Sequence, residues 1–256
     1  MKKSFRPIIR VIEEAYAIPQ LGRKRRIAAL LPHDYEETDK KYPVLYLHDG
    51  QNLFDPNAPY GNWGVDKAMA WMASLGLPQV VIIAIDHGNV NRLKEYAPFT
   101  NKSVGIAEGK LYLQFLLETL KPYVDKTFRV HTDGANTGIG GSSMGGLISL
   151  YAGLNRPEVF SKWMIFSPSL WIAPQMYELT KNFKNLYFPT ALYLYAGGRE
   201  SQEHLPNVIR LAKKLKREDL REQEFRIQVS LNKEGTHSEH YWGLEFPRAV
   251  YWLFGQ

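Results

Sequence analysis

Short apolar segments of strand length recur along the whole chain, and segments with helical spacing lie between most of them. The run at residues 80–85, for example, is uncharged and almost entirely β-branched, which is typical of a parallel strand buried on both faces. We predict strands at residues 8–12, 27–31, 43–47, 80–85, 137–141, 162–166, 191–195 and 225–229. Strands that alternate with helices form a mostly parallel sheet covered by helices on both faces, so we predict an α/β fold.

The predicted helices carry apolar residues three and four positions apart. In residues 109–124, for example, five leucine and valine side chains fall on one face of an amphipathic helix. We predict further helices at residues 65–73, 144–154, 205–215 and 241–254. Because proline lacks a backbone N–H, we expect Pro247 to lie at a break in the last helix or in a fresh first turn.

The length of 256 residues suits one α/β domain, and no repeat or linker divides it. We therefore expect a single domain over residues 1–256. Because the chain has no cysteine, a disulfide framework, a thiolate metal site and a cysteine nucleophile are excluded. The net charge of +6 fits solubility as well as nucleic-acid binding. The basic run Arg23-Lys24-Arg25-Arg26 leads into a predicted strand, so we interpret it as a solvated strand end and expect no nucleic-acid partner.

The N-terminus starts with basic residues, as a signal peptide would, but Arg10 and Glu13 interrupt the apolar segment that follows. Residues 134–155 form the longest uncharged stretch and could cross a bilayer by length alone. That stretch is rich in Gly, Ser and Asn, which argues against a membrane span. We therefore expect a cytoplasmic protein with no membrane partner, and the sequence leaves a homo-oligomer open.

A candidate nucleophile lies between a predicted strand and a predicted helix. Gly141-Ser142-Ser143-Met144-Gly145 matches the pattern G-x-S-x-G. A sharp turn from strand to helix would project the Ser143 hydroxyl, and the crowding in such a turn requires glycine on both sides. The following helix would place its partially positive N–H groups beside the reacting oxygen. We predict that Ser143 is the nucleophile and that Ser142 packs in the turn, the alternative being a glycine-rich turn needed only for packing.

The general base should follow the nucleophile in the chain. His237 lies in the loop between the last predicted strand and the last helix, where it would hang over the serine. His204 is expected on the surface of a charged helix, and His240 is the local competitor, one turn further on. His237 and His240 have no further ligands at suitable spacing, so we expect no metal and no cofactor.

The acid should follow the strand at residues 191–195. Two glycines there allow a sharp turn, after which Glu200 emerges at the carboxyl end of the strand. We predict that Glu200 holds His237 in the correct tautomer and stabilises its imidazolium form. Glu200 could instead be an ordinary acidic residue at a helix N-terminus. Asp219, the one aspartate between Ser143 and His237, lies in a charged helix end and is badly placed.

An acyl-transfer intermediate needs two N–H donors that face its negatively charged oxygen. Met144, directly after the nucleophile, would supply one of them. The loop after the strand at residues 43–47 would supply the other, and Gly50 allows the turn that aims the N–H of Gln51. In the alternative interpretation, Asp49 and Asn52 merely close this loop through side-chain hydrogen bonds.

Five segments together carry a resemblance to a known family. They are Tyr46-Leu-His-Asp-Gly-Gln-Asn-Leu-Phe-Asp55, Asn91-Arg-Leu-Lys-Glu-Tyr-Ala-Pro98, Gly140-Gly-Ser-Ser-Met-Gly-Gly146, Ser167-Pro-Ser-Leu-Trp171 and His237-Ser-Glu-His-Tyr-Trp242. With them the chain resembles the "putative esterase" family of α/β-hydrolases, which includes esterase D, enterochelin-type esterases and the family-one carbohydrate esterases. The resemblance implies the α/β-hydrolase fold with a small lid or none, assigns the base to His237 rather than His240, and places a carboxylate at Glu200.

We therefore interpret the chain as a serine carboxylic-ester hydrolase that works through an acyl-enzyme. Its partner would be a small-molecule ester, with carbohydrate or phenolic esters of the feruloyl or acetyl kind as the expected class. The same residues could serve a thioesterase or an acyltransferase. A non-catalytic binding protein of this fold would require a broken triad, and here all three members are present.

Aromatic residues in the predicted catalytic loops are the candidates for substrate binding. We select Trp63, Trp171 and Trp242, with Tyr60 as a weaker candidate, because flat rings suit sugars and phenols. Core packing is the alternative for each tryptophan. Arg92 is a further candidate for substrate contact, although we first expect it to form a structural ion-pair or hydrogen-bond cluster with Glu95 and Tyr96.

Overall fold

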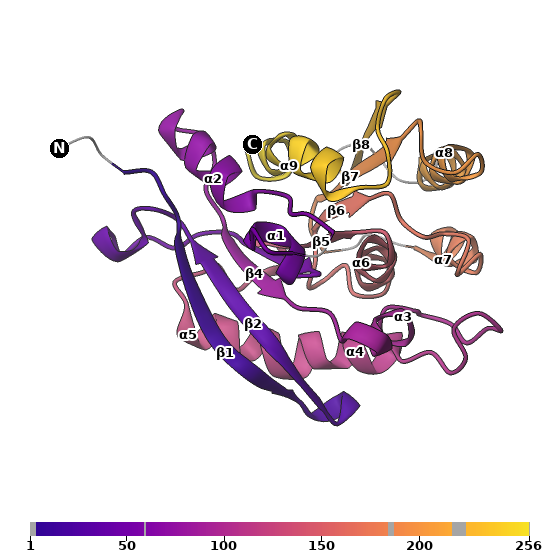
Figure 1. Ribbon diagram of the computed structural model, residues 1–256, viewed down its shortest axis with the longest axis horizontal. Coiled ribbons are helices and arrows are strands. Elements are labelled where there is room, and N and C mark those ends of the chain that lie inside the picture. The colour runs from indigo at the N-terminus through magenta and orange to yellow at the C-terminus, as the bar shows by residue number, and fades with distance from the viewer. Residues whose placement is uncertain (1–3, 59, 184–186, 217–223, 256) are drawn as a thin grey trace.

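The structure is a computed structural model that describes residues 4–58, 60–183, 187–216 and 224–255. These residues form one eight-stranded sheet in the order β1-β2-β4-β3-β5-β6-β7-β8 (Figure 1). The strands are β1 (Ile8–Ile18), β2 (Arg23–Leu31), β3 (Val44–His48), β4 (Val81–Ile85), β5 (Thr137–Ser142), β6 (Lys162–Phe166), β7 (Thr190–Gly197) and β8 (Phe225–Asn232). All eight strands predicted from the sequence are present.

The sheet is mostly parallel, as predicted. β2 runs antiparallel to both of its neighbours, β1 and β4, and every other neighbouring pair is parallel. β1 extends six residues past the predicted end at residue 12, through Glu13 and Glu14. An edge strand has one open side and an exposed face, so charged side chains can remain in water there without breaking the strand.

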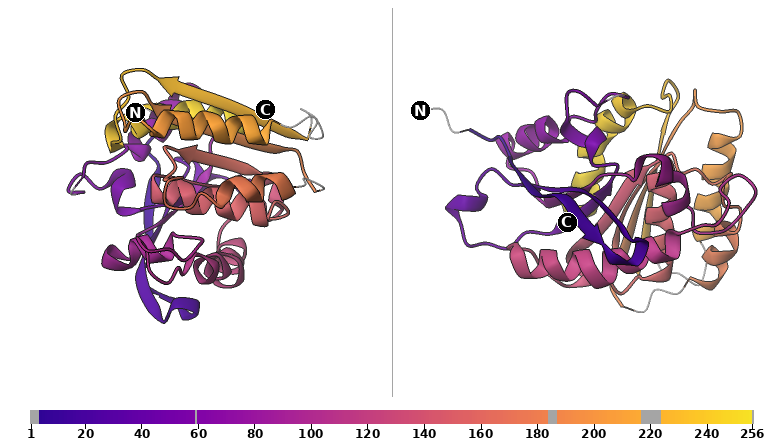
Figure 2. Two further views of the ribbon diagram at one scale, coloured as in Figure 1. Left: turned by 90° about the vertical axis from the view of Figure 1, so that its right-hand side faces the viewer. Right: turned by 60° about the horizontal axis from the view of Figure 1, so that its bottom comes forward.

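The helices cover both faces of the sheet (Figures 1 and 2). They are α1 (Gln51–Phe54), α2 (Val65–Ser74), α3 (Arg92–Glu95), α4 (Gly109–Phe115), α5 (Lys121–Thr127), α6 (Met144–Asn155), α7 (Met176–Asn182), α8 (His204–Leu215) and α9 (Glu239–Phe254). Helices α4 to α8 pack on one face, whereas α2 and α9 pack on the other. Successive residues of β3 enter different cores, with Val44 and Tyr46 in the first and Leu45 and Leu47 in the second.

Two prolines modify the predicted helices. The helix predicted at residues 109–124 is interrupted by a π-helical turn at Leu116–Leu120 and then continues as α5. Pro122 follows that turn, and its missing N–H removes one regular helical hydrogen bond. Pro247 lies inside α9, so the predicted break or fresh start is wrong. Buried residues on both sides of it, such as Phe246 and Ala249, anchor α9 to the sheet and offset the lost hydrogen bond.

The basic run at the start of β2 is not simply solvated. Arg25 is 5% exposed, and its Nη2 lies 2.7 Å from Oε2 of Glu95, which is fully buried. Arg23 reaches the other oxygen of Glu95 at 2.8 Å. The expected solvated strand end is therefore wrong for Arg25, because tertiary packing supplies a buried carboxylate opposite β2.

The parallel strands bring their carboxyl ends to one edge of the sheet, and the loops that follow them meet there. These loops carry Asp49, Ser143, Ser167, Glu200 and His237, from segments far apart in the sequence. This edge is therefore the place to look for a functional site. Among the helices that the structure describes, none is long and apolar enough to cross a membrane.

Candidate active site

Ser143 occupies a strained turn between β5 and α6. Its backbone has φ 57° and ψ −120°, a region that non-glycine residues rarely adopt. Its N–H donates to the carbonyl oxygen of Phe166 at 2.9 Å, which ties the turn to β6. A Cβ on Gly141 would lie 2.9 Å from the backbone of Gly145, so the turn needs glycine there. This geometry presents Ser143 at the start of α6, as in a nucleophile elbow.

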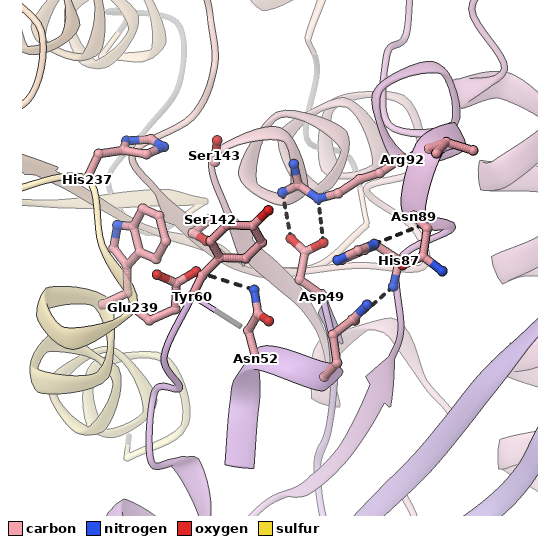
Figure 3. A pocket seen from close by; sticks show the side chains of 13 residues that line it. Asp49, Asn52, Tyr60, His87, Asn89, Arg92, Ser142, Ser143, His237 and Glu239 are labelled. Carbon is pink, nitrogen blue, oxygen red and sulfur yellow. Dashed lines mark hydrogen bonds and ion pairs between the residues drawn. The ribbon is translucent and has the colours of Figure 1, made fainter. Parts of the chain in front are cut away.

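Ser143 and His237 line the same cavity (Figure 3). The Oγ atom of Ser143 lies 3.2 Å from Oγ of Ser169, and the His237 side chain is 41% exposed. No hydrogen bond joins Ser143 to His237 among the described residues. Hydrogen bonds between a nucleophile and its base are often loose without substrate and tighten in the complex, so the separation is compatible with a catalytic pair.

Glu200 is held by donors on both of its oxygens. Oε2 accepts from Nδ1 of His237 at 2.7 Å, while Oε1 accepts from Oγ of Ser167 at 2.6 Å and from N–H of Gly197 at 2.7 Å. The Glu200 side chain is 1% exposed. Burial acts to raise the pKa of this carboxyl, but the hydrogen bonds from His237 and Ser167 outweigh it and hold the pKa below its ordinary value. Glu200 is therefore ionised and fixes the proton of His237 on Nδ1.

Ser167 and Trp242 form a support behind this pair. Nε1 of Trp242 donates to Oγ of Ser167 at 3.0 Å, and the Ser167 hydroxyl donates a hydrogen bond to Glu200. The ring of Trp242 also lies edge-on to His237, with centroids 4.9 Å apart. The role of Ser167 was not predictable from its own segment of the sequence. The sequence does place Ser167 directly after β6, the strand beside the one that leads to the nucleophile. A lone serine at that position does not reveal its hydrogen-bond partner, however.

His204 is buried beside Glu200, so its predicted position on the surface is wrong. Only 8% of its side chain is exposed, and Nε2 lies 3.1 Å from Oε2 of Glu200 without the alignment of a hydrogen bond. The sequence placed His204 on a charged helix but did not show that the first turn of α8 packs onto Glu200. Burial lowers the pKa of His204. In the described part of the chain, no group of three or more His, Asp or Glu side chains is arranged to hold a metal ion.

Both N–H groups predicted for the oxyanion lie at helix starts. Gln51 is the first residue of α1, and Met144 is the first residue of α6. The N–H of Gly50 donates to Ile85 at 2.9 Å, whereas neither Gln51 nor Met144 makes a backbone hydrogen bond through its N–H within the described residues. The side chain of Gln51 accepts from the N–H of His87 at 3.0 Å, which fixes the loop. Both N–H groups are therefore free to bind an anionic oxygen.

The cavity at Ser143 has a volume of about 790 Å³, and most of the residues that line it are polar or charged. Arg92 binds both carboxylate oxygens of Asp49, through Nε at 2.6 Å and Nη2 at 2.8 Å. Burial acts to lower the pKa of Arg92, but the charge of Asp49 more than offsets this, and the pKa lies above its ordinary value. Arg92 thus lines the cavity, with its charge already paired (Figure 3).

The aromatic candidates separate into different environments. Trp242 and Tyr60 line the cavity at Ser143, and Tyr60 is 75% exposed. Trp63 is buried in the core, stacked on Phe166 at 5.4 Å, and does not line this cavity. Trp171 is 67% exposed and lines a second cavity of about 650 Å³, together with His204. Core packing, the alternative interpretation, therefore describes Trp63.

Asp219, which the sequence places badly for the acid, lies outside the described residues. Glu200 is the acidic residue in contact with His237 in the part of the chain that the structure describes.

His48, which precedes the nucleophile in the sequence, is buried at the end of β3. Its Nδ1 lies 3.1 Å from the carbonyl oxygen of Gly140. Burial lowers the pKa of His48 to about 4, so it remains neutral at physiological pH.

Comparisons with known proteins agree with this fold. Protein YbbA of Bacillus subtilis (strain 168) is 27% identical over 244 residues, which cover 91% of this chain and 93% of YbbA. An endo-1,4-beta-xylanase/feruloyl esterase of Xylanibacter ruminicola is 27% identical over 160 residues, which cover 60% of this chain but 21% of that protein. The crystal structure of the BES protein from Bacillus cereus has a TM-score of 0.77 at 17% identity and covers 96% of this chain and 94% of its own.

The profile of the esterase family, described as "Putative esterase", matches residues 18–253. This match extends from the end of β1 to the end of α9 and includes every strand of the parallel part of the sheet. The mostly parallel sheet with helices on both faces is the α/β-hydrolase type of fold that the sequence predicted. The chain therefore belongs to the "Putative esterase" family and is a carboxylesterase-type hydrolase.

Proposed function

We propose that the chain hydrolyses carboxylic esters through an acyl-enzyme on Ser143, with His237 as general base and Glu200 as the acid that orients it. The observation that carries this proposal is the 2.7 Å contact between Oε2 of Glu200 and Nδ1 of His237, at the cavity that Ser143 also lines. With Nδ1 bound to the carboxylate, the other ring nitrogen of His237 is left unprotonated. It can therefore accept a proton from a hydroxyl.

The reaction follows in two balanced halves. Nε2 of His237 takes the hydroxyl proton as Oγ of Ser143 attacks the ester carbonyl carbon, and Glu200 stabilises the resulting imidazolium. The bond to the alcohol oxygen then breaks, and His237 donates the proton to that oxygen. In the second half, water loses a proton to His237 and attacks the acyl carbon. The bond to Ser143 breaks, Oγ regains the proton, and the carboxylic acid leaves.

The N–H groups of Gln51 and Met144 are proposed to hold the oxygen that becomes negatively charged in both halves. Their position at the starts of α1 and α6, without backbone acceptors among the described residues, supports this role. Donors that are fixed before the reaction stabilise the developing charge without reorganisation, and one such donor typically contributes about 10²–10³ in kcat.

The proposed substrates are small esters with carbohydrate or phenolic parts. The exposed Tyr60 offers an aromatic surface at the cavity, and Trp242, which is 4% exposed, lies in its wall; aromatic surfaces suit sugars and phenols. The relative from Xylanibacter ruminicola that carries feruloyl esterase in its name supports the same class. Trp171 in the second cavity is a further proposed contact for the part of a longer substrate that extends past Ser169.

The test compares Ser143→Ala with Ser142→Ala on p-nitrophenyl acetate. We expect Ser143→Ala to lose at least about 10³-fold in kcat while its melting temperature is kept, because the covalent step is gone. The kcat of the control variant Ser142→Ala should stay within about tenfold of that of the parent, since Ser143 is retained. Labelling of the parent by a fluorophosphonate probe, and its loss in Ser143→Ala, gives an independent readout. Hydrolysis by Ser143→Ala at the parent rate would refute the triad.

A further inference from the structure

The cavity at Ser143 carries a charge opposite in sign to that of the chain. The chain has a net charge of +6. Of the described residues that line the cavity, two are carboxylates, Asp49 and Glu239, and one is a guanidinium, Arg92. Because Arg92 and Asp49 neutralise each other through two hydrogen bonds, the uncompensated charge at this wall is that of Glu239. A basic chain therefore presents an acidic wall to its substrate.

Glu239 is the first residue of α9, and its side chain is directed toward the cavity (Figure 3). Oε1 accepts from Nδ2 of Asn52 at 3.3 Å, a long hydrogen bond and the one bond to another side chain that Glu239 makes among the described residues. No cation forms an ion pair with it in the same part of the chain. Burial raises the pKa of Glu239, although a hydrogen bond from its own N–H acts in the opposite direction. The carboxylate thus has unused capacity to accept hydrogen bonds.

Asn52 fixes Glu239 at the same wall. It is 8% exposed, and its Nδ2 donates to Glu239 while its Oδ1 is enclosed. Its backbone is held firmly, because its N–H donates to Asp49 and its carbonyl accepts from Trp63, both at 2.8 Å. A side chain held in this way keeps the carboxylate of Glu239 in place before the substrate binds.

We propose that Glu239 and Asn52 form a subsite that binds hydroxyl groups of the substrate, so that the enzyme acts on polyol-like esters in preference to anionic ones. This inference rests on the proposed function and narrows its substrate class. A hydroxyl both donates and accepts, which matches the Glu239 carboxylate together with the amides of Asn52, Gln51 and Asn89 around the cavity. An ammonium group would satisfy the carboxylate but not the amide donors, and a carboxylate on the substrate would be repelled by Glu239.

The experiment uses two series of esters in which one half is constant. Acetates of ethanol, glycerol, choline and glycolate vary the alcohol part, whereas methyl propanoate and methyl 2,3-dihydroxypropanoate vary the acyl part. We expect kcat/KM for the hydroxylated member to exceed that of its plain counterpart by at least about tenfold in one series. The glycolate ester, which carries a carboxylate, should be slower than ethyl acetate.

The variants Glu239→Gln and Glu239→Ala should reduce the ratio of kcat/KM for the hydroxylated ester to that for its plain counterpart. We expect this ratio to fall about tenfold in Glu239→Ala and by an intermediate factor in Glu239→Gln. The loss should appear mainly in KM, because the hydroxyl is bound in the ground state as well as in the transition state. In Glu239→Gln, the kcat/KM for the glycolate ester should also come closer to that for ethyl acetate. The matched control is Glu234→Gln, an exposed carboxylate of the preceding loop that pairs with Arg199 and should leave every ratio unchanged.

Three outcomes would overturn the subsite. One is equal rates for hydroxylated and plain esters in both series, and another is an unchanged preference in both Glu239 variants. The third is a preference for the choline ester over the glycerol ester, which would make the wall a cation site. Failure of the proposed function looks different, since the folded parent would then hydrolyse none of these esters and would resist the fluorophosphonate probe. That result would remove the subsite as well.

Discussion

Nε2 of His204 lies 3.1 Å from Oε2 of Glu200. The same oxygen accepts the 2.7 Å hydrogen bond from Nδ1 of His237. Nε2 of His204 is not aligned for a hydrogen bond, so its contact with the carboxylate is one of charge and packing. Two histidine rings therefore lie against one carboxylate oxygen, and His204 limits where that oxygen can move.

We predict that His204→Ala lowers kcat by about tenfold with KM nearly unchanged, because the space it leaves beside Glu200 lets the carboxylate that orients His237 shift. His204→Phe refills this space with an aromatic ring and should restore part of the rate. His240→Gln changes an exposed histidine of the neighbouring segment and should leave kcat unchanged. Equal kcat for His204→Ala and the parent would contradict a positioning role of His204.

Ser167 is predicted to be a positioning residue. Its hydroxyl donates to Glu200 at 2.6 Å and accepts from Trp242 at 3.0 Å, so Ser167→Ala removes both bonds. We expect kcat to fall by about tenfold with KM nearly unchanged, since Glu200 loses one of its fixed donors and His237 is held less firmly. Ser167→Cys keeps a small side chain with a weak S–H donor and should restore part of the rate, since the φ of 43° at Ser167 excludes a β-branched threonine. Equal kcat for Ser167→Ala and the parent would show that the bond does not matter for catalysis.

Gly141 is predicted to be required by packing in the turn before α6. The Cβ of Gly141→Ala would lie 2.9 Å from the backbone of Gly145, so one segment has to move. We expect a loss of about 1–3 kcal/mol in the free energy of unfolding together with a large loss of kcat, because the turn positions Ser143. Chemical denaturation and steady-state kinetics check the two effects. A variant of parent stability that lost activity would indicate a purely local effect on the nucleophile.

Asp86 is predicted to destabilise the fold at neutral pH. Burial raises its pKa to about 6, from an ordinary value of 3.8, so the folded state binds the proton more tightly than the unfolded state does. The cost of ionising the buried carboxyl is therefore present above pH 6 and disappears as the pH falls below about 4. Asp86→Asn should gain about 2–3 kcal/mol at pH 8 and little at pH 4.

Denaturant unfolding at pH 8, 6 and 4 measures this dependence. Asp39→Asn, which changes an exposed carboxylate, serves as the control and should show no such gain. If Asp86→Asn were less stable than the parent at pH 8, the prediction would be wrong. The ion pair between Asp86 and Arg26, which are 3.8 Å apart, would then stabilise the fold by more than burial of the charge destabilises it.

The strands and most of the helices could be predicted because their signals are local. Residues 80–85 and 43–47 are continuous apolar runs, and such runs are strands in a doubly covered sheet. The turn around Ser143 could also be predicted, because its glycines serve a conformation set by neighbours in the chain. The roles of Ser143, Glu200 and His237 stay predictions, although the structure places Glu200 and His237 in direct contact.

The remaining parts of the site depend on contacts between segments that are far apart. Asn52 meets Glu239 across 187 residues, and Trp242 meets Ser167 across 75. No periodicity or spacing encodes such a pair, because each partner is unremarkable in its own segment. The buried position of Arg25 has the same origin, since its partner Glu95 comes from another part of the chain.

The sequence by itself determined the alternation of strands and helices, the sharp turn at Ser143 and the order in which the candidate residues follow one another. The tertiary structure decided which side chains share a carboxylate, which tryptophan enters the core and which charge is left at the cavity. The physical reason is that local patterns report burial and backbone conformation, whereas pairing of polar groups requires that distant loops meet at one edge of the sheet. At that edge of the sheet, a chain with a net charge of +6 places the carboxylate of Glu239 in the wall of its cavity.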